Sequence, residues 1–423
     1  MKPTDVKSKV KHGLGWSAIA QFAGLFIRLC STVMVAQFLP PQVYGLLGAA
    51  MAAVTLMEWL TDLGIVPGLT RSKHGDEPEW LRTGWSLNVT RGLVLAIVGI
   101  AFAWPWAALM RLPALGPILA ALALRPAILA LRSPNSLLYR RRMNFKAIAI
   151  EEVVQTLFGA LTTLTVAILT GSVWALVAGT LAGAVAVVIT SYILAPSRPK
   201  FTWNADALSE LRHFGTGVMF NTIAMAMSQN LDRLAGPRVV NLEQLGLYAV
   251  AVNLASVAEG LVVRFCDVHF ATLARQMNPS DQRLTHQWIR HRFAIPFIGG
   301  SILAALGAPW VIDLLYDNRY SQAGPILGLL TIRLSIRTVT LFEFQLLLAL
   351  GRLRPATLAY LVAMPVQLAG LWIVSQSESP DGFNIALCGI AVAMAHLTTQ
   401  AILAGLVRRE STLQDDSVAI IQA

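Results

Sequence analysis

The sequence predicts an all-α polytopic membrane protein, with about 12 transmembrane helices in two six-helix bundles around a central cavity. Of the 423 residues, 55% are hydrophobic and only 13% are charged, whereas about a quarter of a soluble chain is charged. The hydrophobic residues also fall in long runs between short basic loops, and in lipid such runs must be helices. This pattern excludes a soluble enzyme, a disordered protein and a secreted disulfide scaffold.

Twelve apolar runs are long enough to be spans. The first contains Arg28 and lacks a small-residue cleavage site, so we expect an uncleaved helix and not a signal peptide. Strands of a membrane barrel would alternate in shorter runs. The twelve runs lie near 14–37, 43–68, 83–104, 114–131, 147–169, 173–195, 214–236, 246–272, 293–315, 325–350, 356–375 and 383–407.

Lysine and arginine gather in alternate loops. The intervening loops hold only Arg111, Arg238 and Arg319. Basic loops face the cytoplasm, so this alternation predicts that both termini are cytoplasmic. The strongest cluster is YRRRMNFK, from Tyr139 to Lys146, which we interpret as a topology anchor that contacts anionic lipid.

The remaining composition excludes several kinds of chemistry. The net charge of +10 follows the loops, so we expect no nucleic acid partner. Cys30, Cys266 and Cys388 lie far apart without a C-x-x-C motif, so neither a metal site nor a disulfide framework is indicated. The chain has no phosphate loop, nucleophile elbow or H-E-x-x-H helix. We therefore expect no catalytic residue, no cofactor and no enzyme activity.

Two segments about half a chain apart look related. QFLPPQVYGLLGAAMAAV begins at Gln37 and VVNLEQLGLYAVAVNLAS begins at Val239, and the alignment places Gly45 opposite Gly246. Two six-helix halves in the same orientation follow, with a cavity between them near the midplane of the membrane. The predicted organisation is an N-terminal bundle over 1–200, a C-terminal bundle over 201–410 and a cytoplasmic tail over 411–423.

Several segments resemble the polysaccharide-transporter family, the Wzx-type flippases of the MOP superfamily. They are GWSAIAQFAGLFIRL, FLPPQVYGLLG, TDLGIVPGLTR, LGLYAVAVNLAS, LLYDNRYSQAGPILGLLTI and LLLALGRLRPA. The resemblance covers most of the chain through loose glycine, tyrosine and apolar motifs. It implies a two-bundle transporter with twelve to fourteen helices that moves a polyprenyl-pyrophosphate-linked oligosaccharide across the inner membrane, of which this chain would be a twelve-helix member.

Arginines inside the spans are the candidate substrate ligands, because a charge in lipid is costly and should face a cavity or a partner. Arg333 and Arg337 are four residues apart and share a helix face, where an anion between them would relieve their repulsion. We predict that they bind the pyrophosphate together with Arg28, and Arg264 is a further candidate. The alternative for Arg28, Arg333 and Arg337 is pairing with Glu58, Asp62 or Glu259. Arg264 and Asp267 are three residues apart, and for them we favour pairing with each other.

Glu58 and Asp62 share a helix face by the same spacing. Two carboxylates in a cavity of low dielectric raise the pKa of one another, which is how a proton or sodium site forms. A role in ion coupling is therefore predicted for Glu58, Asp62 and Glu259. The alternative for Asp62 is a capping or packing role.

The leading hypothesis is a flippase in the bacterial cytoplasmic membrane that serves lipopolysaccharide or exopolysaccharide biosynthesis by alternating access. Its partners would be the lipid-linked oligosaccharide, membrane lipids and a polysaccharide polymerase or export machinery. One rival is a MATE-like drug or metabolite antiporter of the same superfamily. The rival from another class, a polysaccharide polymerase or glycosyltransferase, is disfavoured by the short external loops.

Overall fold

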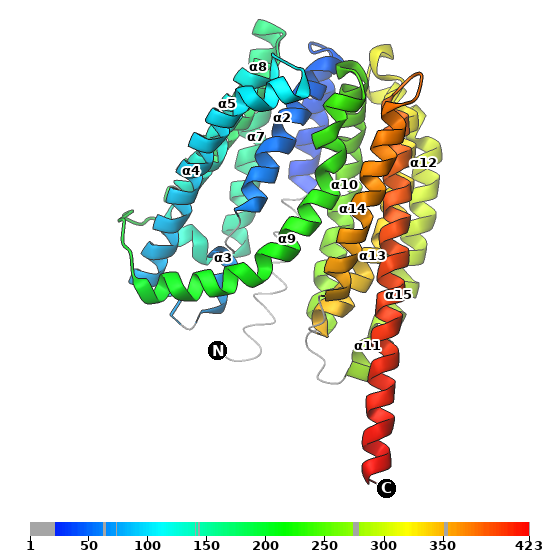
Figure 1. Cartoon of the computed structure of the whole chain (residues 1–423). Coiled ribbons are helices and arrows are strands. Elements are labelled where there is room, and N and C mark those ends of the chain that lie inside the picture. Colours follow the sequence, from blue (N-terminus) through cyan, green and yellow to red (C-terminus); the bar gives the residue numbers. More distant parts are fainter. Residues whose placement is uncertain are drawn as a thin grey trace. The chain divides into compact units, whose positions relative to one another are not determined.

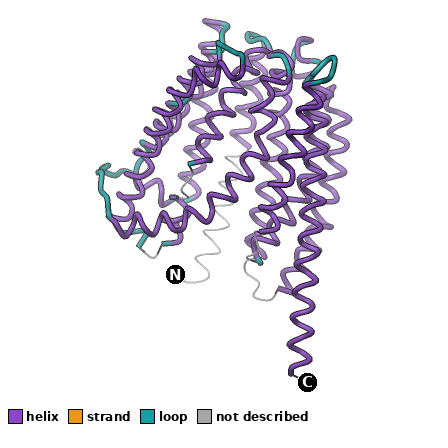
Figure 2. Tube along the Cα trace, in the orientation of Figure 1, coloured by secondary structure: helices purple, strands orange, loops and turns teal. Residues whose placement is uncertain are grey.

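A computed structural model describes residues 22–422 apart from 62–64, 73, 140, 143, 274–278 and 351–353. These described residues form helices and loops without a strand (Figure 2), and the predicted all-α class is confirmed. The chain divides into two compact units, Met1–Ala226 and Met227–Ala423, hereafter unit 1 and unit 2. This division falls within a helix, after the predicted boundary at 200/201, and the predicted bundles and the cavity between them stay predictions.

Most helices of unit 1 are labelled in Figure 1. In chain order the elements of this unit are Phe22–Ala36, α2 (Pro41–Leu60), α3 (Ile65–Arg71), α4 (Pro78–Met110), α5 (Leu115–Leu122), α6 (Leu124–Ala130), the 3₁₀ turn η1 (Pro134–Leu138), α7 (Phe145–Thr170) and α8 (Trp174–Leu194).

Unit 2 begins within α9, and the part of this helix up to Ala226 belongs to unit 1. Helix α9 is labelled in Figure 1. The elements of unit 2 are α9 (Ala205–Val239), α10 (Leu242–Leu273), α11 (Pro279–Ile289), the π-helical turn η2 (Arg290–Ala294), α12 (Ile295–Leu315), the 3₁₀ turn η3 (Asn318–Tyr320), α13 (Ala323–Ala349), α14 (Arg354–Ser375) and α15 (Gly382–Gln422).

Eleven of the twelve predicted runs coincide with apolar helices. Within the described residues, nine helices are long and apolar enough to cross a membrane, and Phe22–Ala36 and Leu115–Ala130 are shorter apolar helices. The remaining run, 214–236, lies within α9, so the count of twelve stays a prediction.

Two of these runs are each made of two helices. The run near 43–68 comprises α2 and α3, and the run near 114–131 comprises α5 and α6. Both second helices carry a proline in the first turn, Pro67 in α3 and Pro126 in α6. Proline fits there because the first N–H groups of a helix have no partner within the helix.

Glycines allow α7 and α8 to pack closely in unit 1. A Cβ atom added to Gly179 of α8 would overlap Oγ1 of Thr163 and would lie 2.6 Å from the carbonyl oxygen of Gly159, both on α7. A Cβ atom added to Gly183 would lie 2.8 Å from the carbonyl oxygen of Gln155. Small residues let membrane helices approach in this way, and the contact fixes the position of α7.

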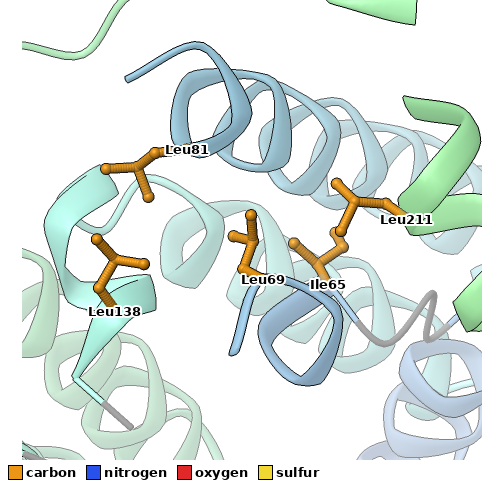
Figure 3. Close-up of a cluster of buried hydrophobic side chains, with 5 residues drawn as sticks. All are labelled: Ile65, Leu69, Leu81, Leu138 and Leu211. Carbon is orange, nitrogen blue, oxygen red and sulfur yellow. The ribbon is translucent and has the colours of Figure 1, made fainter. Parts of the chain in front are cut away.

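A buried leucine-rich cluster connects α3, α4, η1 and the beginning of α9 (Figure 3). Leu69 and Leu138 are fully buried in it, and Leu211 of α9 is 1% exposed. The first turns of α9 are thereby fixed to unit 1. The cluster comprises Ile65, Leu69, Leu81, Leu138 and Leu211.

Arg141 of the basic YRRRMNFK segment forms hydrogen bonds within the protein. Nη1 of Arg141 donates to the carbonyl oxygens of Leu69 at 3.2 Å and Ser72 at 2.6 Å. Nε of Arg141 donates to Asp76 at 2.6 Å, and this hydrogen bond lowers the pKa of the Asp76 carboxyl. Arg141 therefore holds the loop after α3, a role beyond the predicted contact with lipid.

The two units repeat the same order of helix contacts. In unit 1, α4 packs on α5 and α7 packs on α8; in unit 2, α12 packs on α13 and α14 packs on α15. Helix α2 begins at Pro41 and α10 begins at Leu242, about 200 residues later, as the aligned sequence segments predict. The internal repeat therefore extends to the way in which helices pair.

Candidate functional site

Arg333 and Arg337 line one pocket of unit 2, which we call the Arg333–Arg337 pocket. It lies among α9, α10 and α13 and has a volume of about 60 Å³, enough for a few water molecules. Its lining residues are Asp232, Arg233, Tyr248, Val252, Ala255, Ser256, Glu259, Leu330, Arg333, Leu334 and Arg337. The predicted arginine pair therefore does share one face of α13.

The inner end of this pocket is a buried ion pair. Nη1 of Arg333 donates to Oδ2 of Asp232 at 3.2 Å, and the two side chains are only 14% and 5% exposed. The hydroxyl of Tyr248, a fully buried residue, donates to the same carboxylate oxygen at 2.5 Å. A buried charge is tolerated when it is paired and hydrogen-bonded in this way, so we assign Asp232 and Tyr248 to holding Arg333 in place.

Helix α15 leaves room for the Arg333 side chain. A Cβ atom added to Gly389 would lie 3.0 Å from Nη1 and 3.1 Å from Cδ of Arg333. Any larger residue at this position would push the arginine away from Asp232. Four helices, α9, α10, α13 and α15, therefore fix the inner guanidinium.

The outer end of the pocket holds a more accessible ion pair. Nη1 of Arg337 lies 2.6 Å from Oε1 of Glu259, and these side chains are 21% and 33% exposed. A pair that water can reach is weaker than a buried one, because solvent screens both charges. An incoming anion can therefore compete with Glu259 for Arg337 more easily than it can displace Asp232 from Arg333.

The pocket carries an excess of positive charge. Its lining contains three guanidinium groups, on Arg233, Arg333 and Arg337, and only two carboxylates, on Asp232 and Glu259. Arginine presents a planar array of donors that suits the oxygens of a phosphate. The chemistry of this pocket thus favours an anion, even though acidic residues pair with both predicted arginines.

The equivalent place in unit 1 also contains an arginine–glutamate ion pair. Nη1 of Arg125 on α6 lies 2.9 Å from Oε1 of Glu58 on α2. Nε of Arg91 donates to Oγ1 of Thr61 at 3.1 Å, and the Arg91 guanidinium also donates to the carbonyl oxygen of Glu58. Glu58 therefore has an arginine partner, and the role in ion coupling predicted for Glu58, Asp62 and Glu259 stays a prediction.

A repeat in the sequence explains this equivalence. The segment LGPILAALALRPAIL begins at Leu115 and AGPILGLLTIRLSIR begins at Ala323. The alignment of their GPIL motifs places Arg125 opposite Arg333, but Leu129 opposite Arg337. The earlier repeat, aligned on its glycines, places Glu58 opposite Glu259. Both units therefore have a glutamate and an arginine at matching positions, and Arg337 belongs to unit 2 alone.

The other predicted ligands do not gather in this pocket. Arg28 is exposed on the helix Phe22–Ala36 and has no ion-pair partner among the described residues. The side chain of Arg264 and the whole of Asp62 lie outside the described part of the chain. The binding roles of Arg28 and Arg264 stay predictions.

Unit 2 also holds a polar cluster that sequence reasoning missed. Nδ1 of His286 on α11 lies 3.2 Å from Nε2 of His269 on α10. Nε2 of His286 lies 3.2 Å from Oε1 of Glu343 on α13. Arg290 of the π-helical turn donates to Glu343 at 2.8 Å. His269, His286 and Glu343 are too far apart in sequence for spacing to bring them together. Because Glu343 pairs within unit 2, its charge is neutralised by the protein itself.

A family model described as "Polysaccharide biosynthesis protein" matches residues 34–325, more than half of the chain. The chain belongs to this family. Membership in the polysaccharide biosynthesis protein family confirms the resemblance found in the sequence.

Two relatives share low but extended identity with this family member. This chain is 24% identical over 346 residues to "Succinoglycan biosynthesis transport protein ExoT" of Rhizobium meliloti (strain 1021). The alignment covers 80% of this chain and 69% of that protein. The chain is 22% identical to "Lipopolysaccharide biosynthesis protein WzxC" of Escherichia coli (strain K12), in an alignment that covers 60% of this chain and 52% of the relative. The chain thus aligns with about half the length of the second relative.

Solved structures show the same fold at low identity. The "Lipid II flippase MurJ, inward closed conformation" gives a TM-score of 0.75 at 11% identity and covers 92% of this chain and 86% of its own. An inward-facing "multidrug resistance MATE family transporter of the MOP superfamily" gives 0.72 at 11% identity and covers 93% and 99%. The chain therefore has the helical, membrane-spanning fold of MOP transporters.

Proposed function

We propose that this protein flips a polyprenyl-pyrophosphate-linked oligosaccharide across the cytoplasmic membrane for cell-surface or exopolysaccharide biosynthesis. The observation that carries the proposal is the Arg333–Arg337 pocket, a cationic pocket in a unit of apolar helices. Membership in the polysaccharide biosynthesis protein family and the transport function named for the ExoT relative support it. Sugars and phosphates cannot cross hydrocarbon about 30 Å thick unaided, so transfer needs such a polar place.

In this proposal Arg337 exchanges Glu259 for the pyrophosphate, while Arg333 stays fixed by Asp232. The exchange keeps the Arg337 guanidinium paired before and after binding, and the released Glu259 carboxylate, which is 33% exposed, stays within reach of solvent. The polyprenyl tail stays in lipid, and alternating access exposes the head group first to the cytoplasm and then to the outer side. The chain acts as a transporter without enzyme activity, and its termini are cytoplasmic.

Partners and location follow from this role. The charge pattern of the loops supports the cytoplasmic membrane with both ends of the chain inside. A polysaccharide polymerase or export machinery would consume the flipped product. We include such a partner in the proposal because removal of product outside would sustain net flux.

A deletion strain tests the proposal. We expect complete lipid-linked repeat units to accumulate in the inner membrane while surface polysaccharide disappears, and Arg337→Ala to fail in complementation. The matched control is Arg319→Ala, since Arg319 is half-exposed and pairs with Asp317 two residues away, outside the spans. Arg319→Ala should restore polysaccharide.

One result would favour the antiporter. If surface polysaccharide is normal in the deletion strain, no lipid-linked intermediate accumulates, and the genome holds no second copy of this function, the flippase proposal fails. The fold does not distinguish a flippase from an antiporter, because a MATE transporter and a lipid flippase both share it. The excess positive charge of the pocket is what argues against cationic drugs.

A further inference from the structure

A second and larger cavity lies within unit 1, among α2, α4, α6 and α7. Its volume is about 670 Å³, within the range of roughly 300–1,000 Å³ that is usual for small-molecule sites. None of its lining residues belongs to the Arg333–Arg337 pocket. We call it the unit 1 cavity.

The charges in the unit 1 cavity balance. The lining contains the guanidinium groups of three arginines and the carboxylates of three glutamates. Arg125 pairs with Glu58 at 2.9 Å, and Arg132 forms an ion pair with Glu151. Unlike the pocket of unit 2, this cavity has no excess charge to attract an anion. The six residues are Arg91, Arg125, Arg132, Glu58, Glu151 and Glu152.

Two further polar side chains, and one of these glutamates, line the cavity with their hydrogen-bonding groups unused. Asn88 of α4 and Glu152 and Gln155 of α7 make no side-chain hydrogen bond or ion pair within the described part of the chain. Each carboxamide offers two donor hydrogens and an acceptor oxygen. Polar groups inside a cavity normally find partners, so this arrangement points to a ligand rich in hydroxyl groups.

An aromatic side chain adds an apolar surface to the same cavity. Trp59 of α2 follows Glu58 in the sequence and is half-buried in the lining. An indole ring provides a flat apolar face and an N–H donor. A pyranose ring has the complementary character, with C–H groups on its faces and hydroxyl groups around its edge.

We propose that the unit 1 cavity binds uncharged sugar residues of the lipid-linked substrate. Asn88 and Gln155 bind the hydroxyl groups, Trp59 packs against a sugar ring, and the balanced ion pairs make the site neutral. This inference rests on the proposed function and divides recognition between the units: unit 2 takes the pyrophosphate and unit 1 takes the glycan.

Binding of two lipids by the full-length protein in nanodiscs tests the inference. The first probe is the lipid-linked oligosaccharide extracted from the deletion strain, and the second is polyprenyl pyrophosphate without sugar. The test variant is Asn88→Leu combined with Gln155→Leu. The control is Thr156→Val, because Thr156 is the neighbour of Gln155 on α7 but does not line the cavity.

We expect the double variant to bind the glycosylated lipid about tenfold or more weakly, because each lost hydrogen bond weakens binding about two- to tenfold. Its affinity for the sugar-free lipid should equal that of the wild type. Thr156→Val should bind both lipids normally, whereas Arg337→Ala should weaken binding of both.

Three results would overturn the inference alone. The first two are unchanged binding of the glycosylated lipid by the double variant and an equal loss of affinity for both lipids. The third is displacement of the glycosylated lipid from the cavity by phosphatidylethanolamine, whose head group carries one charge of each sign. If the wild-type protein binds neither lipid, the proposed function fails as well. The two failures are therefore distinguishable.

A labelling experiment covers the case in which the leucine variants do not fold. Gln155→Cys is introduced into a chain whose native cysteines, Cys30, Cys266 and Cys388, are replaced by alanine. We expect the glycosylated lipid, but not the sugar-free lipid, to slow its reaction with a maleimide. Thr156→Cys should show no such difference, and equal protection of Gln155→Cys by both lipids contradicts the inference.

Discussion

Removal of one carboxylate at a time should separate the two ion pairs of the Arg333–Arg337 pocket. Asp232→Asn keeps the shape of the side chain but leaves Arg333 buried without a counter-ion. Glu259→Gln likewise leaves Arg337 without a counter-ion, but water reaches the Arg337 side chain. The two substitutions change the formal charge of the pocket equally, so burial and the hydrogen bond from Tyr248 to Asp232 distinguish their effects on stability.

The expected difference follows from the exposure of the side chains. Asp232 and Arg333 are 5% and 14% exposed, and removal of one partner from a buried pair costs about 3–5 kcal/mol. Glu259 and Arg337 are 33% and 21% exposed, and pairs within reach of solvent contribute at most about 1 kcal/mol. A unit of this size loses about 2–4 °C in Tm per kcal/mol, so the apparent Tm should fall by at least about 6 °C for Asp232→Asn and at most about 4 °C for Glu259→Gln.

Thermal scans of the purified variants in one detergent and at one scan rate measure both shifts. The control is the double variant Asp232→Asn with Arg333→Gln, which removes both charges and should recover part of the lost stability. Equal shifts for the two single variants, or a double variant no more stable than Asp232→Asn, would refute the assignment of a structural inner pair and an exchangeable outer pair.

Three other substitutions test the remaining contacts. Glu259→Gln should bind polyprenyl pyrophosphate more tightly in a nanodisc binding assay, because Arg337 loses its competing partner; weaker binding would contradict the exchange. Gly389→Val should lower both Tm and transport, since its side chain would displace Arg333 from Asp232; a fully active variant would contradict that contact. Gly179→Val should destabilise the protein by several degrees in a thermal scan, because its Cβ would overlap Thr163, whereas a stable variant would show that α7 and α8 separate easily.

The helical class and the family could be predicted from the sequence because the bilayer leaves the backbone few choices. A run of apolar residues of sufficient length must form a helix in lipid. The places of the apolar runs along the chain therefore predict the positions of α4, α7, α8, α10 and their neighbours. The apolar runs did not predict that one run can be divided into two helices where a proline allows a second helix to begin, as at Pro126 of α6.

The ion pairs could be predicted only in part. Four-residue spacing places Arg333 and Arg337 on one face of α13, but the partner of Arg333 is Asp232, which is 101 positions away. Lipid is as apolar as a leucine side chain, so the apolar pattern of a membrane helix does not reveal which face meets which neighbour. The GPIL repeat was the available signal that Arg125 and Arg333 occupy equivalent places.

The match between Leu129 and Arg337 has a consequence for how such transporters diversify. An ancestral half that is copied in tandem supplies two frameworks with the same glutamate and arginine, and each copy can then change on its own. One substitution on the GPIL helix is enough to give one copy a surplus positive charge while the other remains neutral. Selectivity for a different head group can therefore evolve in one half without any change to the packing of its sister.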